Sequence, residues 1–170
     1  AIDHLHAARV YPESLGEGKL HGAQENDIFF WLGCALAQLG NPDAVHAFRQ
    51  ATIGLDEPTA AMFYNDQQPD KIFYQGLAWL QLGESDRATE IFEKLLHYGE
   101  SHLHDEVSID YFAVSLPDLL IFDVDLNTRN QVHCHFMRAL GHLGLTQYDK
   151  AKSALEKVLQ QDASHQGAIT

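Results

Sequence analysis

The sequence predicts an all-α fold in which helical hairpins stack into a solenoid, with non-standard inserts between the repeats. Three times an apolar stretch ends in Leu-Gly, at Leu39-Gly40, Leu82-Gly83 and Leu143-Gly144. A glycine just beyond a helix can take the left-handed conformation that ends it. Small and then large apolar residues follow each glycine at spacings of four and three, which places them on one stripe of a second helix: Ala44, Phe48 and Ala51, then Ala88, Phe92 and Leu95, then Ala151, Leu155 and Val158. Hairpins of this kind bury their apolar faces only against their neighbours, which indicates a protein that presents a surface.

The first part of the chain predicts a short amphipathic helix and then a hairpin. The helix covers about 3–10 and ends before Tyr11-Pro12, because a residue that precedes proline is disfavoured in the helical region. Since the chain opens inside this helix without Met, we expect a fragment of a longer protein. After a Gly-rich connector, the first hairpin has helices at about 26–39 and 42–53, with Asn41 as N-cap and Pro42 at the first helical position.

The rest of the chain predicts two more hairpins and an insert. A short helix at about 58–64 precedes the second hairpin, whose helices cover 70–82 and 85–98 and whose end is marked by Gly99. The third hairpin has helices at 128–143 and 147–160, the second of them opened by Thr146 and Asp149. One domain over 1–170 thus contains repeat pairs at about 26–53, 70–98 and 128–160 and an insert at 99–127, with a short helix opened by Ser115, Pro117 and Asp118.

The middle repeat resembles the tetratricopeptide repeat (TPR). Gly76, Trp79, Leu82-Gly83, Ala88 and Phe92 fall at the TPR spacing, and the first repeat has a matching glycine, Gly33, seven positions before its turn. The first turn is one residue short, the third is two residues long, and Met137 takes the place of the packing glycine. Turn glycines recur every ~34 residues in TPR arrays, whereas inserts separate them here. The flanking segments are similar to the C-terminal TPR region of a large bacterial multidomain family of uncharacterised function.

This resemblance implies a right-handed solenoid whose first helices line a concave groove. The groove would be mostly apolar, and only Arg138 could contribute to a clamp for a peptide carboxylate. We therefore expect a protein–protein or intramolecular scaffold that takes an amphipathic helix of another protein, the parent chain's own preceding domain, or the chain's own insert. The expected groove residues are Asp27, Phe30, Cys34, Ala37 and Gln38, then Asp70, Phe73, Leu77, Leu80 and Gln81, then Gln131, Cys134, Arg138 and His142.

Composition excludes several kinds of partner. The net charge is −13, with 11 basic against 24 acidic residues, so we expect neither nucleic acid nor an anionic membrane surface as a partner. No apolar run approaches the ~20 residues that span a bilayer. The two cysteines, Cys34 and Cys134, form no C-x-x-C pair and are expected to be reduced and buried, which favours a cytoplasmic protein. The pairs His102-x-His104 and His133-x-His135 lack the ligand number and spacing of a metal site, so we expect no metal and no cofactor.

An alternative function rests on the acidic insert. Paired carboxylates hydrolyse glycosidic bonds, and the segment 98–130 contains Glu100, Asp105, Glu106, Asp110, Asp118, Asp123 and Asp125. In this reading, the chain is an accessory or catalytic part of a carbohydrate-active protein, with sugar rings stacked on Trp31, Tyr74, Trp79 and Tyr111. The plainer reading makes the acids helix caps and solvated turns, and the aromatic residues other than Tyr111 part of the core. We favour that reading and expect no enzyme activity.

Overall fold

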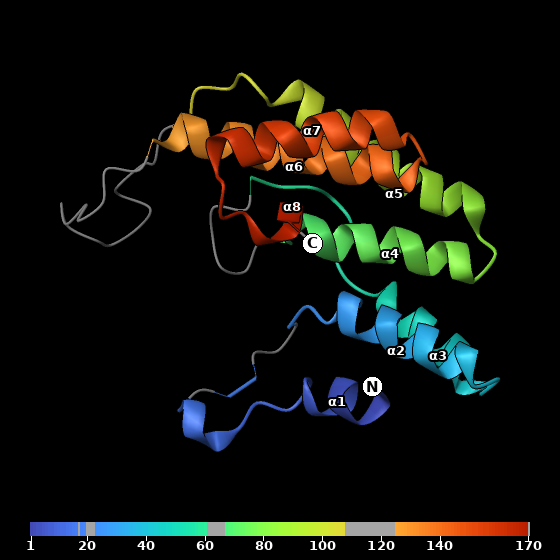
Figure 1. Cartoon of the computed structure of the whole chain (residues 1–170). Coiled ribbons are helices and arrows are strands. Elements are labelled where there is room, and N and C mark those ends of the chain that lie inside the picture. Colours follow the sequence, from blue (N-terminus) through green and yellow to red (C-terminus); the bar gives the residue numbers. More distant parts are fainter. Residues whose placement is uncertain (17, 20–22, 61–66, 108–124, 170) are drawn as a thin grey trace.

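The computed structural model describes residues 1–16, 18–19, 23–60, 67–107 and 125–169, and these are all-helical (Figure 1). The first helix is α1 (Ile2–Ala7), followed by a 3-10 turn η1 (Glu13–Leu15). Three hairpins follow, as predicted from the turns: α2 (Asn26–Gln38) with α3 (Asp43–Ala51), α4 (Pro69–Gln81) with α5 (Ser85–Ser101), and α6 (Leu126–Gly144) with α7 (Tyr148–Gln161). A last short helix, α8 (Gln166–Ile169), was not predicted.

Two short helices predicted from the sequence are not found among the described residues. The helix expected at 58–64 is absent from residues 58–60, and its remaining positions lie outside the described residues. The helix expected at Ser115 also lies outside them. Within the described part of the chain, none of the helices has the length and apolar character that a bilayer-spanning segment requires.

Gly99 does not end its helix, which corrects the sequence prediction. The helix α5 runs on to Ser101, and Gly99 is buried against α6. A Cβ atom at Gly99 would lie 2.5 Å from the carbonyl oxygen of Cys134. This glycine therefore allows close approach of two helix backbones rather than a change of chain direction.

The third turn also lies elsewhere than predicted. Gly144 is still helical, and the left-handed residue is Thr146, with φ of 58°. Counted from Thr146, the third hairpin has the spacing of the second: Ala139 stands seven positions before the turn, like Gly76 before Gly83, and Ala151, Leu155 and Val158 follow at the same distances as Ala88, Phe92 and Leu95. The third repeat is therefore not longer than the second, and Met137 is not at its packing position.

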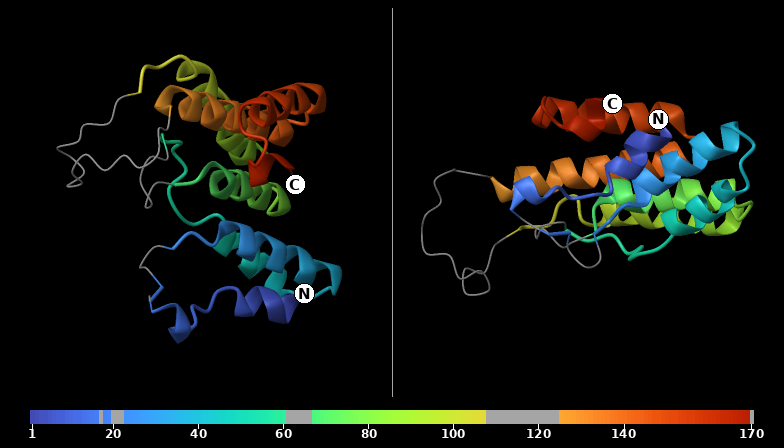
Figure 2. Two further views of the ribbon diagram at one scale, coloured as in Figure 1. Left: turned by 60° about the vertical axis from the view of Figure 1, so that its left-hand side comes forward. Right: turned by 90° about the horizontal axis from the view of Figure 1, so that it is seen from below.

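The first two hairpins stack in sequence, and the third is placed differently. The helix α4 contacts both α2 and α3, and α6 contacts both α4 and α5. In Figures 1 and 2, α5 lies on one side of α6 and α7 on the other, whereas α3 lies on the same side as α5. As a result, α6 is enclosed, with every residue from Cys134 to His142 except Arg138 buried. A helix that is buried around most of its circumference is a core element and cannot offer a free face.

Phe92 of α5 is at the centre of the larger core cluster. Its side chain is 1% exposed and contacts Phe73 with ring centroids 5.7 Å apart. A Cβ atom built at Gly76 of α4 or at Gly144 of α6 would overlap the Phe92 ring. The ring is therefore held between two helices that approach closely because both lack a side chain there. Gly33 has the same relation to Phe48 in the first hairpin, where a Cβ atom would lie 2.6 Å from the ring.

We expect Gly144→Ala to destabilise the protein by about 2 kcal/mol, although alanine is the better helix former. The added methyl group meets the Phe92 ring, which cannot move away because Gly76 confines its other side. Urea unfolding monitored by circular dichroism measures the effect. The exposed α7 substitution Ser153→Ala serves as the control and should be close to neutral. A stabilised Gly144→Ala variant would contradict this packing.

Replacing Thr146 with glycine at the third turn should stabilise the folded protein. Thr146 is β-branched, and its backbone has the left-handed conformation. This conformation costs roughly 1–2 kcal/mol for a residue other than glycine. We expect Thr146→Gly to raise the free energy of unfolding by about 0.5 kcal/mol or more, after the greater backbone entropy of glycine in the unfolded chain is subtracted. The same unfolding assay measures it. A loss of stability would indicate that the turn is at Gly144 after all.

Candidate functional site

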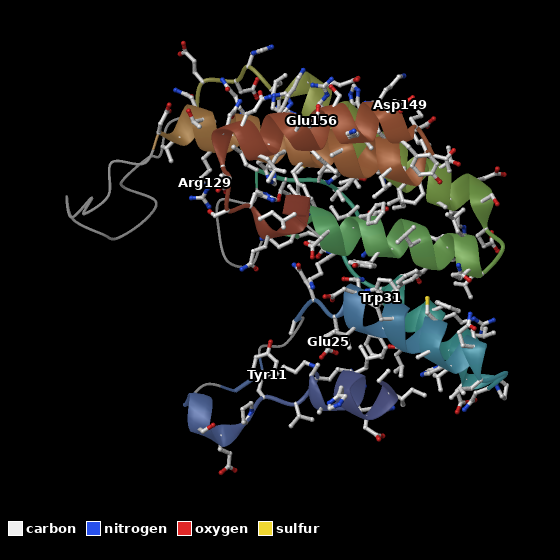
Figure 3. The ribbon with its side chains drawn as sticks, viewed as in Figure 1. Tyr11, Glu25, Trp31, Arg129, Asp149 and Glu156 are labelled. Carbon is white, nitrogen blue, oxygen red and sulfur yellow. The ribbon has the colours of Figure 1, made fainter. Side chains whose placement is uncertain are left out.

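Trp31 of α2 is the most exposed aromatic residue on the face where the groove was expected. It is 52% exposed, and its Nε1–H donates to the hydroxyl oxygen of Tyr74 on α4, 3.2 Å away. Tyr74 packs in turn against Phe30, with ring centroids 5.5 Å apart. Figure 3 shows Trp31 between α2 and α4. The indole ring is thus fixed in position by α4 while about half of its surface remains available for a partner.

An ion pair joins the two helices on the same face. Lys71 Nζ of α4 lies 2.6 Å from Asp27 Oδ1 of α2 and 3.7 Å from Asp70 Oδ2. Asp27 precedes Trp31 by one helical turn, and Asp70 precedes Tyr74 by one turn, so these residues continue the same stripe. The pair is partly exposed, and its main effect is to set the alignment of α2 and α4 rather than to add much stability.

Farther along the two helices this face becomes apolar and then polar. Leu77 is half-buried, Leu80 is 42% exposed, and Gln38 and Gln81 are exposed at the C-terminal ends of α2 and α4. We call the stripe formed by Asp27, Trp31, Cys34, Ala37, Gln38, Asp70, Tyr74, Leu77, Leu80 and Gln81 the α2–α4 surface. Two other expected groove residues, Phe30 and Phe73, are buried in the core and support this surface from behind.

The residues expected to continue the groove into the third repeat do not do so. His142 is buried, with Nδ1 3.0 Å from Gln147 Oε1. Gln131 accepts a hydrogen bond from Gln161 of α7, and Arg138 lies beside His135, with Nη1 to Nδ1 at 3.4 Å. The sequence placed them by counting from Met137, two positions out of register, and α7 covers a side of α6 that was expected to be open. Cys134 is likewise buried.

The C-terminal segment covers part of the same side of the molecule. His165 stacks on Phe136 of α6, with ring centroids 4.6 Å apart, and Gly167 is so close to that ring that a Cβ atom would lie 2.6 Å from it. Ala168 packs against the larger core cluster. In Figure 1, α8 lies beside the beginning of α4. The α2–α4 surface is therefore bounded on one side by α8.

Both thiols, and the carboxylate of Asp125, are held in structural surroundings. Both cysteines are free, and burial, with a smaller effect of the Asp105 charge, raises the pKa of Cys134 to about 11. Burial also raises the pKa of Cys34. Such thiols are poor nucleophiles because little thiolate is present at neutral pH. Asp125 caps α6 by accepting from the backbone N–H of Asn127 and from the Thr128 hydroxyl, which lowers its pKa.

Some of the residues named for the carbohydrate and metal hypotheses lie in the described part of the chain. His102 Nδ1 pairs with Asp105 Oδ2 at 2.6 Å, and His133 Nε2 contacts the carbonyl oxygen of Thr59 at 2.7 Å. Among the described residues, no three His, Cys, Asp or Glu side chains are grouped as metal ligands. The acids Asp110, Asp118 and Asp123, and also Tyr111, lie outside the described residues. Trp79 is partly buried beneath Arg87, whereas Trp31 is exposed, contrary to its expected place in the core.

Comparison with known proteins gives no assignment: no protein-family model matches the chain, and no solved structure matches it. Trp31 and Tyr74 each stand nine positions before their turn glycines, one position after Phe30 and Phe73, and this equal spacing is the sequence signal that could have paired the two rings.

His135 provides a prediction about pH. Burial, together with the positive charges of Arg138, Lys157 and His104, lowers its pKa below the ordinary 6.5. Between the folded-state pKa and pH 6.5, the unfolded chain therefore binds more protons than the folded chain. As a result, the free energy of unfolding that is present above pH 6.5 decreases as the pH falls through the folded-state pKa. We expect the variant His135→Gln to lose less stability than the parent between pH 7.5 and pH 5.5, a range chosen around the usual histidine pKa of about 6.5.

Urea unfolding at the two pH values measures the difference, and His4→Gln on the exposed side of α1 is the matched control. The control should follow the parent protein. Equal pH dependence in parent and His135→Gln would show that His135 charges as easily in the folded as in the unfolded chain.

Proposed function

We propose that this chain is a divergent TPR-like interaction module that binds an apolar-faced helical segment on the α2–α4 surface. The observation that carries the proposal is the exposure of Trp31 at a position fixed by Tyr74. A rigid, half-exposed indole on the same surface as the exposed Leu80 is the kind of anchor on which protein interfaces concentrate their binding energy. The stacked hairpins with TPR-like spacing support the assignment to this repeat class, with the third hairpin as a departure from it.

The surface favours a peptide or protein as the ligand. Its exposed side chains are apolar or uncharged along most of the stripe, and its charges form an internal pair between Lys71 and Asp27. An amphipathic helix with apolar residues three and four positions apart could cover Trp31 and Leu80 together. The partner is either another protein or a preceding domain of the same polypeptide. The α2–α4 surface is short because α6 is enclosed, so a segment of two to three helical turns matches it.

A peptide library displayed on phage tests the proposal. We expect selection on the protein to enrich 16-residue peptides with apolar residues at helical spacing, with dissociation constants in the micromolar range. Trp31→Ala should weaken their binding at least tenfold, since truncating a tryptophan anchor costs about 2 kcal/mol. Fluorescence polarisation with a labelled, enriched peptide measures both values.

Tyr148→Ala is the matched control, because Tyr148 on α7 is an exposed aromatic residue, 64% accessible, outside the α2–α4 surface. It should leave the affinity unchanged. Failure to enrich any peptide, or an equal effect of the two substitutions, would refute this surface as the binding site.

A further inference from the structure

A second cleft, separate from the α2–α4 surface, lies where α2 begins and the chain passes from α3 towards α4. Its volume is about 510 Å³. Figure 3 shows the side chain of Glu25 at this end of α2. Most of the wall is apolar, with Ala23, Phe29, Ile53 and Leu55, and Gly54 contributes backbone alone. Concave sites of this size with a few placed polar groups are where small ligands bind.

Several polar groups around the cleft have partners within the protein. Asn26 Nδ2 donates to the carbonyl oxygens of Ala51 and Ile53 at 2.9 and 2.8 Å. Glu25 forms ion pairs with Arg9, at 3.2 Å, and with Lys19. The Asn26 bonds hold the start of α2 against the end of α3, and the ion pairs hold it against the N-terminal segment, so the wall of the cleft is preformed.

Gln67 is the exception. It is 3% exposed, and among the described residues that line the cleft its Nε2 is the one buried side-chain nitrogen or oxygen without a hydrogen-bond partner. Gly54, with φ of 127°, lies beside it, and a Cβ atom there would be 3.9 Å from Gln67 Nε2. A larger residue would partly close this space, and the conformation itself favours glycine. A buried donor left unpaired costs free energy, so a donor of this kind on a residue that lines a cleft indicates an absent acceptor.

The neighbouring amide of Gln75 does not pair with this donor. Gln75 also approaches Gly54, where a Cβ atom would lie 3.3 Å from its Nε2. Its Nε2 donates to the carbonyl oxygens of Leu55 and Ile53 at 3.2 and 3.5 Å. These two carbonyl groups fix the orientation of the Gln75 amide, with its nitrogen towards residues 53–55. Gln75 Oε1 is itself buried without a partner, and no described acceptor lies within hydrogen-bond distance of Gln67 Nε2, so this donor can take an acceptor from a ligand.

We infer that this cleft binds an uncharged molecule that carries one carbonyl oxygen on an apolar body, such as a peptide group with an aliphatic side chain. The carbonyl oxygen accepts from Gln67 Nε2, and the aliphatic part contacts Ile53, Leu55 and Phe29. An anion fits poorly, because Glu25 is already paired with Arg9 and Lys19, and a buried carboxylate would lose its hydration without gaining a free cation beside the unpaired donor. A sugar fits poorly as well, since each buried hydroxyl needs a partner and the cleft offers one unpaired buried donor.

Titration with small probes followed by NMR tests the inference on the intact chain. The neutral probe is N-acetyl-leucine methylamide, with N-acetyl-leucine as its anionic counterpart and methyl glucoside as the sugar. We expect the neutral probe to shift the side-chain amide resonance of Gln67, with a Kd on the order of 1 mM, as ordinary ligand efficiency gives for its size. The anion should bind at least tenfold more weakly, and the glucoside should not shift this resonance.

Gln67→Met keeps the length of the side chain and removes the donor. We expect it to abolish saturable binding of the neutral probe while the melting temperature stays equal or rises, because an unpaired buried donor has been removed. Gln160→Met, an exposed substitution on α7, is the matched control and should bind like the parent. If Gln67→Met fails to fold, the Gln67 resonance in the parent still decides the question.

Three results would overturn the inference: no shift of the Gln67 amide with any probe, equal binding of the glucoside, or unchanged binding by Gln67→Met. The first would mean that the cleft holds only solvent. None of these bears on Trp31, so the cleft and the α2–α4 surface are tested separately.

Discussion

The packing of Phe92 between two glycines is the contact on which the rest of this structure depends. Gly76 of α4 and Gly144 of α6 both face its ring, and Gly141 brings α6 so close to α5 that a Cβ atom there would lie 2.8 Å from the Phe92 carbonyl oxygen. Three helices therefore converge on one side chain with little room for adjustment. Close-packed contacts of this kind resist small displacements, because a shift in one helix must be matched by the others.

This convergence also explains which surface remains free. Because α6 approaches α5 closely and α7 covers its other side, α6 becomes a core helix, and the expected groove is confined to α2 and α4. Trp31 contacts Tyr74 of α4 there and keeps about half of its surface exposed. The same arrangement places α8 against Phe136, next to the beginning of α4. The proposed partner thus meets a short, rigid surface rather than a long concave groove.

Carboxamide side chains play a structural role in the first half of the molecule. Asn26 and Gln75 both donate to carbonyl groups of the segment after α3, which has left the helix and needs partners for its backbone. Gln67 occupies similar surroundings without such a carbonyl group. The unpaired Nε2 of Gln67, at the wall of the cleft, is the basis for the proposed ligand site.

The sequence by itself determined the all-helical class and the three hairpins, because local signals suffice: apolar residues at helical spacing, Gly40 and Gly83 at positions that require a left-handed turn, and Pro42 and Pro69 near helix starts. It could not distinguish a glycine that ends a helix from one that admits a neighbour. Gly99 and Gly144 were therefore misread as helix ends, and the register of the third repeat shifted by two residues. Only the tertiary structure decided that α7 encloses α6, that Trp31 is exposed and that Gln67 is buried without a partner, since each depends on residues far apart in the chain.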